Sequence, residues 1–421
     1  MKEDSKYIIT GIDIGTTKIA VVIAEWSEGE PISILGVGQS PSHGLKKGVV
    51  SNINQTVDSI KTAVEKAETQ SGIKVESAYV SITGDHIKGI NNTGVITVSK
   101  NNSRIPSDQE ITSADVKRVL EHAKSITLPL ERRILHVLSQ EFKVDNHTGI
   151  DNPLGMTGHR LEARVHLVTS AITTEKNLAT CMEKVGIDVI DFVLEPLASS
   201  FAVLDPNEKN LGVALLDIGG GTTDVIVYYD GGVHHTGVIP YGGDNITYDI
   251  AHGVQTTLEQ AEMLKCQYGS AKEALSGTEE TITISGIGDR ESRTISQREL
   301  ASFIEPRMKE ILTFSLSEIR KSNYRGTFTF GIVLTGGGAL LNNVTDLSQE
   351  IFHQAVKIGK PLLSGGVAES VQDPIFSTVV GLIHYAIDHW DERSEDDKLP
   401  IGLSFFTDIY DKIKNFFRNL Y

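Results

Sequence analysis

Hydrophobic residues form the same strand–turn–strand pattern at two places along the chain. The first spans residues 7–24, where two apolar runs flank the turn Asp-Ile-Gly-Thr-Thr-Lys. The second spans residues 211–229, where two apolar runs flank Asp-Ile-Gly-Gly-Gly-Thr-Thr-Asp. β-Branched and apolar runs interrupted by Gly and Thr predict a β-hairpin in each case. The shared order of Asp-Ile-Gly and Thr-Thr predicts two related lobes, each presenting a glycine turn.

The two turns carry chemistry that suits a phosphorylated ligand. Glycine lets consecutive backbone N–H groups converge on an anion, threonine hydroxyls add donors, and Lys18 adds a point charge for a phosphate oxygen. Asp13 and Asp217 end the incoming strands, where a carboxylate can hold a magnesium ion directly or through its waters. For either hairpin alone, an ordinary β-turn is as good an interpretation as a phosphate-binding turn. Two copies in the same order favour a site that holds a nucleotide from both sides.

A third glycine cluster follows another apolar stretch. Residues 330–334 predict a strand, and a Thr-Gly-Gly-Gly turn follows at residues 335–338. Such a passage resembles the phosphate turns of nucleotide folds, although a glycine run after a strand is often only a turn. The chain has no P-loop, nucleophile-elbow or H-E-x-x-H motif, so P-loop NTPase, serine hydrolase and zincin classes find no support. The pair His234-His235 is interpreted as a polar strand end or turn rather than a metal site.

Composition narrows the class of protein further. A chain of 421 residues predicts about two to four domains, and a formal net charge of −16 disfavours general nucleic-acid binding. Cys181 and Cys266 are the only cysteines, which excludes a disulfide framework or an iron–sulfur centre. The N-terminus has no signal-peptide pattern, and no stretch reaches the roughly 18 apolar residues of a membrane-spanning helix. A soluble, cytoplasmic protein is therefore expected, with one reservation at the C-terminus.

The composition of the C-terminal segment changes twice. Residues 391–401 are rich in acids and predict a flexible, solvated linker. Residues 402–421 predict an amphipathic helix with a broad aromatic stripe. The stripe contains Phe406, Ile409, Tyr410, Ile413, Phe416, Phe417 and Leu420, and the cations outside it are Lys412, Lys414 and Arg418. This combination is typical of a helix that lies in an anionic membrane surface, the alternative being a terminal helix docked on the protein's own core.

In this order, the three glycine motifs resemble those of the actin/Hsp70/sugar-kinase superfamily. The resemblance implies an α/β class, with an actin-like two-lobed ATPase fold made of duplicated ribonuclease H-like halves. In that superfamily the two hairpins bind phosphates and the third turn contacts adenosine. Helices that connect the lobes are matched by residues 195–200, which open with Glu-Pro, and by residues 377–382. A helix that contacts ribose and adenine is matched by Glu262 and Lys265, although such a pair is also a common solvated ion pair.

The resemblance narrows to the FtsA family, the actin-like proteins of bacterial cell division, and covers nearly the whole chain. Besides the amphipathic C-terminus, it is carried by four passages, at residues 44–48, 79–86, 304–307 and 335–339. The implied units are a first lobe (7–84, 164–196 and 378–390), an inserted α+β subdomain (85–163), a second lobe (197–240 and 307–377), an outer subdomain (241–306), the linker (391–401) and the membrane helix (402–421).

The inserted subdomain has elements of its own. Residues 94–98 predict a strand, and an apolar spacing at Val116, Val119, Leu120 and Ala123 predicts a helix. Because the segment carries no nucleotide motif, it is interpreted as an interaction surface for other division proteins. A structural elaboration is the alternative.

By resemblance, ATP and Mg²⁺ bind between the lobes. Asp13 and Asp217 would organise the metal, through its waters, and Glu195 would orient an attacking water if hydrolysis occurs. The implied ATP-binding residues are Gly15, Thr16, Thr17, Lys18, Gly219, Gly220, Gly221, Thr222, Thr223, Gly243, Glu262, Lys265, Gly336, Gly337 and Gly338. Phosphoryl transfer needs mainly positioning and charge neutralisation, so these parts suffice for chemistry without requiring it to be fast. Enzymatic activity stays open at this stage, and nucleotide could serve mainly to fix the lobe angle.

The resemblance also implies partners. An FtsA-like protein tethers the FtsZ ring to the cytoplasmic membrane at the division septum and assembles into filaments. The FtsZ C-terminal peptide would bind the outer subdomain, where Arg298, Ser302 and Arg307 are the candidates, although either arginine is equally explained as a solvated helix charge. Two alternatives remain open: a small-molecule kinase of the same superfamily, and a pilus-assembly actin-like protein, against which the C-terminal helix argues.

Overall fold

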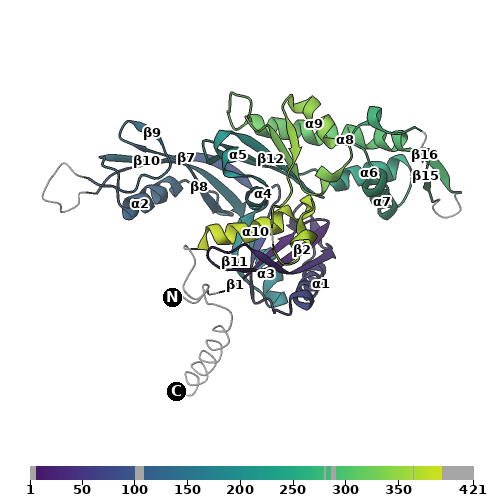
Figure 1. Ribbon diagram of the computed structural model, residues 1–421, viewed down its shortest axis with the longest axis horizontal. Coiled ribbons are helices and arrows are strands. Elements are labelled where there is room, and N and C mark those ends of the chain that lie inside the picture. The colour runs from purple at the N-terminus through teal and green to yellow at the C-terminus, as the bar shows by residue number, and fades with distance from the viewer. Residues whose placement is uncertain (1–5, 100–108, 279–280, 286–290, 364, 391–421) are drawn as a thin grey trace, which may run out of the picture.

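Two lobes and two peripheral subdomains make up the computed structural model, which describes residues 6–99, 109–278, 281–285, 291–363 and 365–390. Each lobe contains a five-stranded sheet, and one subdomain extends from each end of the long axis (Figure 1). The predicted hairpins of residues 7–24 and 211–229 form the centre of the two sheets.

The two sheets share one topology, which confirms the duplication. Their orders are β3-β2-β1-β6-β11 and β14-β13-β12-β17-β18, and in each sheet three antiparallel strands continue into two parallel ones. The first sheet comprises β1 (Tyr7–Ile14), β2 (Lys18–Trp26), β3 (Ser33–Pro41), β6 (Ser77–Ile82) and β11 (Asp188–Leu194). The second comprises β12 (Val213–Ile218), β13 (Thr223–Tyr229), β14 (Gly232–Ile239), β17 (Ile332–Thr335) and β18 (Val356–Ile358).

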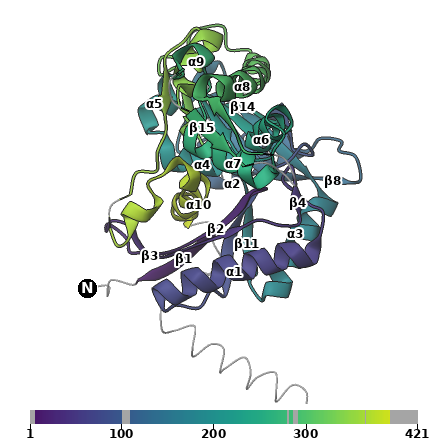
Figure 2. The same ribbon diagram turned by 90° about the vertical axis from the view of Figure 1, so that its right-hand side faces the viewer.

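Helix α1 (Ile53–Ser71) covers the outer face of the first sheet (Figure 2). It begins where the Asn52 side chain accepts a hydrogen bond from the Gln55 N–H, and it ends at Gly72, whose φ of 71° is left-handed. Its buried side chains recur every three or four residues, as a helix packed along one face requires.

The two connecting helices, α4 (Glu195–Val203) and α10 (Ser377–Asp388), pack against each other in a core that both sheets share. Their backbones approach closely, because a Cβ on Gly381 would lie 1.8 Å from the Ala198 carbonyl oxygen. A glycine at this crossing therefore lets the two connecting helices pack closely.

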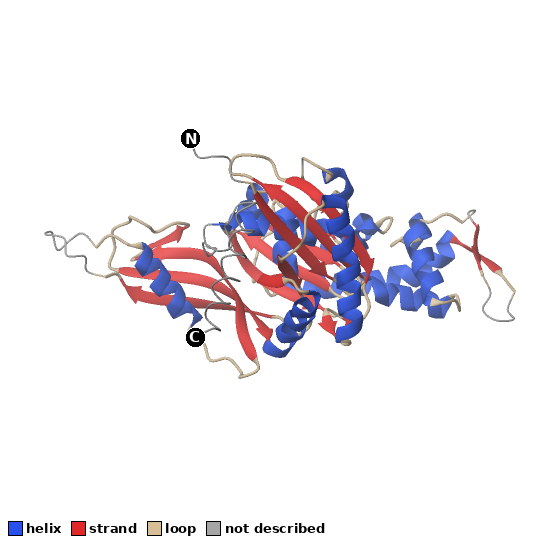
Figure 3. Ribbon diagram, turned by 90° about the horizontal axis from the view of Figure 1, so that it is seen from below, coloured by secondary structure: helices blue, strands red, loops and turns tan. Residues whose placement is uncertain are grey.

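The inserted subdomain is a four-stranded sheet with one helix across it (Figure 3). The strands are β7 (Lys88–Thr97), β8 (Arg132–Val144), β9 (His147–Ile150) and β10 (Arg160–Ala171), and the helix is α2 (Ser113–Lys124). Val119 and Ala123 of the predicted helix are fully buried against the sheet. A capping box between Thr112 and Asp115 starts that helix.

At the opposite end, three helices and a short hairpin form the outer subdomain (Figure 1). They are α6 (Gly243–Gly253), α7 (Leu258–Tyr268), α8 (Gln297–Arg320), β15 (Thr281–Ile284) and β16 (Arg293–Ser296). The remaining strands and α-helices of the described residues are β4 (Leu45–Lys46), β5 (Val49–Val50), α3 (Ile172–Val185), α5 (Pro206–Leu211) and α9 (Val344–Phe352). The unit boundaries expected at 163/164, 196/197 and 306/307 fall inside β10, α4 and α8, so these elements are shared between neighbouring units.

Candidate functional site

The two glycine turns have the same backbone geometry. In the first, the Gly15 N–H donates to the Lys18 carbonyl at 3.1 Å, and in the second the Gly219 N–H donates to the Thr222 carbonyl at 2.9 Å. In each hairpin, the first residue of the four-residue turn thus donates its N–H to the carbonyl of the fourth.

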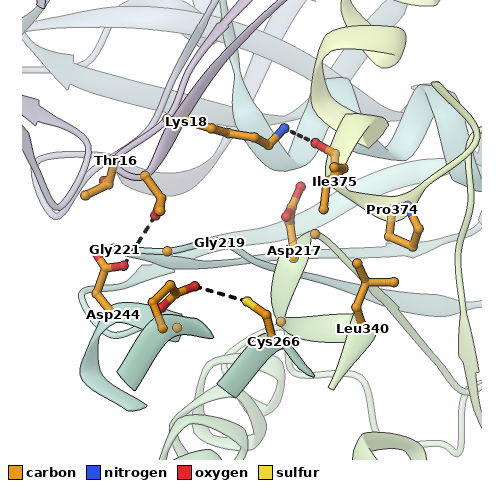
Figure 4. A pocket seen from close by; sticks show the side chains of 18 of the residues that line it. Thr16, Lys18, Asp217, Gly219, Gly221, Asp244, Cys266, Leu340, Pro374 and Ile375 are labelled. Atoms are coloured by element: carbon orange, nitrogen blue, oxygen red, sulfur yellow. Dashed lines mark hydrogen bonds between the residues drawn. The ribbon is translucent and has the colours of Figure 1, made fainter. Parts of the chain in front are cut away.

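The turns come from different lobes and meet face to face (Figure 4). A Cβ on Gly220 would lie 1.6 Å from Thr17 Oγ1, and one on Gly221 would lie 2.5 Å from Thr16 Oγ1. Only glycine permits this approach, which explains the run of glycines in the second turn.

A cavity of about 1000 Å³ lies at this junction. It is lined by 17 of the residues named above as catalytic or ATP-binding: Asp13, Gly15, Thr16, Thr17, Lys18, Glu195, Asp217, Gly219, Gly220, Gly221, Thr222, Gly243, Glu262, Lys265, Gly336, Gly337 and Gly338. Thr223 differs, because it is fully buried and its hydroxyl donates to the Tyr241 carbonyl at 2.9 Å. It anchors the second turn to the lobe rather than facing the cavity.

The carboxylates that end the two central strands are buried and held by hydroxyls. Ser81 Oγ donates to Asp13 at 2.8 Å. Ser199 Oγ of α4 and Thr378 Oγ1 of α10 both donate to Asp217 Oδ2, so each connecting helix contacts this carboxylate. Burial raises the pKa of Asp217 to about 6, and burial also raises the pKa of Asp13, which the Lys18 charge opposes.

Glu195 lies at the start of α4, with 8% of its surface exposed. Burial raises its pKa well above the ordinary 4.5, and the nearby charges of Asp224, Asp13 and Asp217 raise it further. Burial and the neighbouring acids therefore both favour the protonated form of this side chain. It lines the cavity, where it can orient a group by hydrogen bonding.

Asp224 is a further acid near the site, which the sequence motifs did not identify as functional. It is fully buried, and Thr83 Oγ1 of the first lobe donates to its Oδ1 at 2.5 Å. Its other oxygen is also buried. Burial raises the pKa of Asp224 to about 7. Asp224 is the last residue of the second turn motif, and this position is the only signal that the sequence gives for it. Its hydrogen-bond partner Thr83 is 141 positions away in the sequence.

Lys18 enters the cavity from the first turn and reaches a segment that sequence reasoning missed. Its Nζ donates to the Ile375 carbonyl (Figure 4). The same nitrogen lies 5.0 Å from the centroid of the Phe376 ring. Pro374 and Ile375 line the cavity just before α10 begins. Burial lowers the pKa of Lys18, which the charge of Asp13 opposes.

Charge within the cavity fits a phosphorylated ligand that carries a divalent cation. Five acids and three lysines line it, the acids being Asp13, Glu195, Asp217, Asp244 and Glu262 and the lysines Lys18, Lys66 and Lys265. Buried carboxylates need a compensating cation, and magnesium prefers oxygen ligands. In the described part of the chain, no three His, Cys, Asp or Glu side chains are grouped closely enough to hold a metal. The carboxylate oxygens of Asp13 and Asp217 are of the type that magnesium prefers.

Another part of the cavity wall consists of the third glycine turn, an ion pair and two leucines. Gly336 has a φ of 79°, and a Cβ there would lie 2.3 Å from Asp217 Oδ1. Lys265 Nζ pairs with Glu262 at 2.6 Å and also donates to Thr247 Oγ1 at 2.9 Å. The predicted ion pair therefore exists, and it faces the cavity rather than bulk solvent. Leu340 and Leu341 add an apolar wall.

The candidate peptide-binding residues lie together on α8, away from the cavity. Arg298 already pairs with Glu273 at 3.1 Å, and Arg307 pairs with Asp249 at 2.6 Å. Ser302 Oγ donates to the Glu299 carbonyl at 2.7 Å. Both arginines are thus matched with acids of the outer subdomain, an arrangement that sequence reasoning did not find.

The predicted membrane helix at 402–421 and its linker lie outside the described residues. Within the described ranges, no helix combines the length and the apolarity needed to cross a bilayer.

Comparison with protein families gives two matches. The family profile "Cell division protein FtsA" matches residues 214–381, and the profile "SHS2 domain inserted in FTSA" matches residues 84–169. A cell division protein FtsA of Pseudomonas aeruginosa is 42% identical over 397 residues, covering 94% of this chain and 92% of the relative. The corresponding protein of Escherichia coli K12 is 36% identical over 406 residues, covering 94% and 95%.

Solved structures share the fold at low sequence identity. A chain of a PilM-PilN type IV pilus biogenesis complex has a TM-score of 0.62 at 16% identity, covering 90% of this chain and 98% of that chain. MreB5 of Spiroplasma citri bound to AMPPNP has a TM-score of 0.54 at 14% identity, covering 93% and 98%. Both similarities concern the two-lobed architecture.

Proposed function

The chain belongs to the FtsA family of actin-like cell-division proteins, and we propose that it binds Mg-ATP between its lobes while linking the FtsZ ring to the membrane. One observation supports the nucleotide site above all. Two equivalent turns from the duplicated lobes meet at one edge and together line a cavity of about 1000 Å³ that carries five acids and three lysines. Solved MreB5 structures of the same fold contain ADP or AMPPNP, which supports the same assignment.

Each part of the cavity has a proposed role. The turn amides and Lys18 would bind the phosphates, Asp13 and Asp217 would hold the magnesium ion through its waters, and the Gly336–Gly338 turn would contact the adenosine. When bound, the metal ion would neutralise phosphate charge. Glu195, buried at the start of α4 and lining the cavity, would orient an attacking water by hydrogen bonding if hydrolysis occurs. Nucleotide acts mainly as a ligand that fixes the lobe angle and favours filaments.

Binding of Mg-ATP by the full chain tests the site directly. Calorimetry should show Mg-dependent binding that Lys18→Ala weakens at least about tenfold, since a charge-assisted contact to phosphate is lost. Lys61→Ala, an exposed change on α1, is the matched control and should bind normally. Unchanged affinity in Lys18→Ala would place the nucleotide elsewhere.

For the membrane, we propose that residues 402–421 form the anchor at the septum. Their basic–aromatic pattern and the acidic linker before them support this role. Deleting 402–421 should abolish co-sedimentation with liposomes that contain anionic lipid, while Mg-ATP binding remains. Retained sedimentation would refute the anchor.

For FtsZ, we propose that its C-terminal peptide binds the face of α8 that carries Arg298. That side chain is 52% exposed and pairs with one carboxylate in solvent, so an acidic peptide can displace the pair at little cost. Arg298→Ala should weaken peptide binding in a fluorescence-polarisation assay. Lys309→Ala, an exposed change further along α8, is the control. Equal weakening by both would indicate a non-specific charge effect.

A further inference from the structure

The structure separates the two threonines of the first turn. The Gly48 N–H donates to Thr16 Oγ1 at 3.0 Å, which uses an acceptor site of that hydroxyl and not its hydrogen. Thr17 Oγ1 instead donates its hydrogen across the cleft to Asp244 Oδ1, at 3.3 Å. The two hydroxyls therefore differ in what they can offer a ligand.

Asp244 is itself fixed to the second turn. It lies in the first turn of α6, and its backbone N–H donates to the Gly220 carbonyl at 2.8 Å. The neighbouring Gly243 N–H donates to the Gly219 carbonyl at 2.9 Å. The Asp244 carboxylate thus extends from a segment that is tied to the second lobe and reaches the tip of the first.

The contact occurs at the point where the two turns are nearest. A Cβ on Gly220 would lie 1.6 Å from Thr17 Oγ1 and 3.2 Å from Asp244 Oδ1. The hydroxyl and the carboxylate therefore fill the space next to Gly220, and the contact between the lobes is made by protein atoms.

Charge argues against Asp244 being a phosphate ligand. A carboxylate repels phosphate oxygens, whereas it accepts a threonine hydrogen readily. Burial raises the pKa of Asp244, and the positive charge of Lys265 opposes this rise. Asp244 is therefore suited to hold a protein group in place.

We propose that Asp244 is a positioning residue of the nucleotide site. It holds Thr17 across the cleft and so sets the spacing of the two turns, and Thr16 is the hydroxyl that donates to the bound phosphates. This assignment rests on the proposed nucleotide function. It adds that the two adjacent threonines have different roles, Thr17 in the contact between the turns and Thr16 in phosphate binding.

Double-mutant cycles on the full chain test it, with fluorescent mant-ATP and Mg²⁺ as the probe. Thr17→Val and Asp244→Ala should each speed mant-ATP dissociation about three- to tenfold, as expected for one lost hydrogen bond. The double variant should be no faster than either single variant, because both remove the same contact. Asp244→Asn keeps an acceptor oxygen and should restore a rate near that of the wild type.

Thr16→Val is the matched control. It should weaken mant-ATP binding independently, so its effect and that of Asp244→Ala should multiply. Melting temperatures separate folding from binding, and Thr17→Ser keeps the hydroxyl if Thr17→Val does not fold.

Two results would overturn the assignment. One is a Thr17 effect that multiplies with that of Asp244→Ala, which would mean that Thr17 contacts nucleotide directly. The other is an Asp244→Ala variant with an unchanged dissociation rate. A wild-type protein that fails to bind mant-ATP at all would instead refute the proposed nucleotide function.

Discussion

Replacing Asp217 by Asn should make the ligand-free protein more stable and the nucleotide site inactive. Asp217 is 3% exposed, and burial raises its pKa to about 6 from an ordinary value of 3.8. At 1.36 kcal/mol per pKa unit, that difference corresponds to about 3 kcal/mol of destabilisation when the carboxylate is charged. An Asn oxygen can still accept the Ser199 and Thr378 hydroxyls, so most of this penalty should be relieved.

The pH dependence follows from the direction of the shift. A carboxyl group whose pKa is raised in the folded state favours the folded protein at low pH and costs stability as pH rises. The penalty of Asp217 therefore develops between about pH 4 and pH 6 and is complete at pH 7. Asp217→Asn should exceed the wild type by about 1–3 kcal/mol at pH 7, and the difference should shrink towards pH 4.

Urea unfolding at pH 4 and pH 7, with and without Mg-ATP, measures this difference in the free energy of unfolding. Saturating nucleotide, at about 100 times its Kd, should stabilise the wild type by about 2.7 kcal/mol and leave Asp217→Asn unchanged. Asp58→Asn, an exposed change on α1, should stay within about 0.5 kcal/mol of the wild type. A ligand-free Asp217→Asn protein that is less stable than the wild type at pH 7 would refute the reasoning, as would full stabilisation of that variant by Mg-ATP.

Three further outcomes are expected. Gly336→Ala forces a side chain into left-handed backbone and against Asp217 Oδ1, 2.3 Å away, so it should lower the melting temperature and prevent Mg-ATP binding; a normal titration would contradict this. Gly381→Ala places a Cβ 1.8 Å from the Ala198 carbonyl oxygen and should cost at least about 2 kcal/mol in urea unfolding, because backbone must move at the helix crossing. Cys266 lines the cavity, so Mg-ATP should slow its alkylation by a maleimide in mass spectrometry, and equal labelling would show that nucleotide does not reach it.

Local sequence patterns were sufficient for the two central hairpins. Continuous apolar runs around an Asp-Ile-Gly turn allow little besides a buried strand, a turn and a second strand, and the structure has these as β1–β2 and β12–β13. The period of Val119 and Ala123 likewise predicted α2, whose buried side these residues occupy. In these segments, local preference and burial point the same way.

Contacts between distant segments could not be predicted in this way. Thr83 and Asp224 are 141 positions apart, and Thr17 and Asp244 are 227 apart, so no spacing rule relates them. Their pairing depends on how the two lobes are rotated around the connecting helices. A threonine in a phosphate turn was expected to face the ligand, whereas Thr223 is turned into the lobe, because its strand position points its hydroxyl at the Tyr241 carbonyl.

Hydrogen exchange of the full chain, with and without Mg-ATP, tests the central claim most directly. If both turns hold one ligand, the amides of residues 16–18 and 220–222 should become protected together, with the same dependence on Mg-ATP concentration. Protection of only one turn, or of neither while nucleotide still binds, would contradict a site shared by the two lobes.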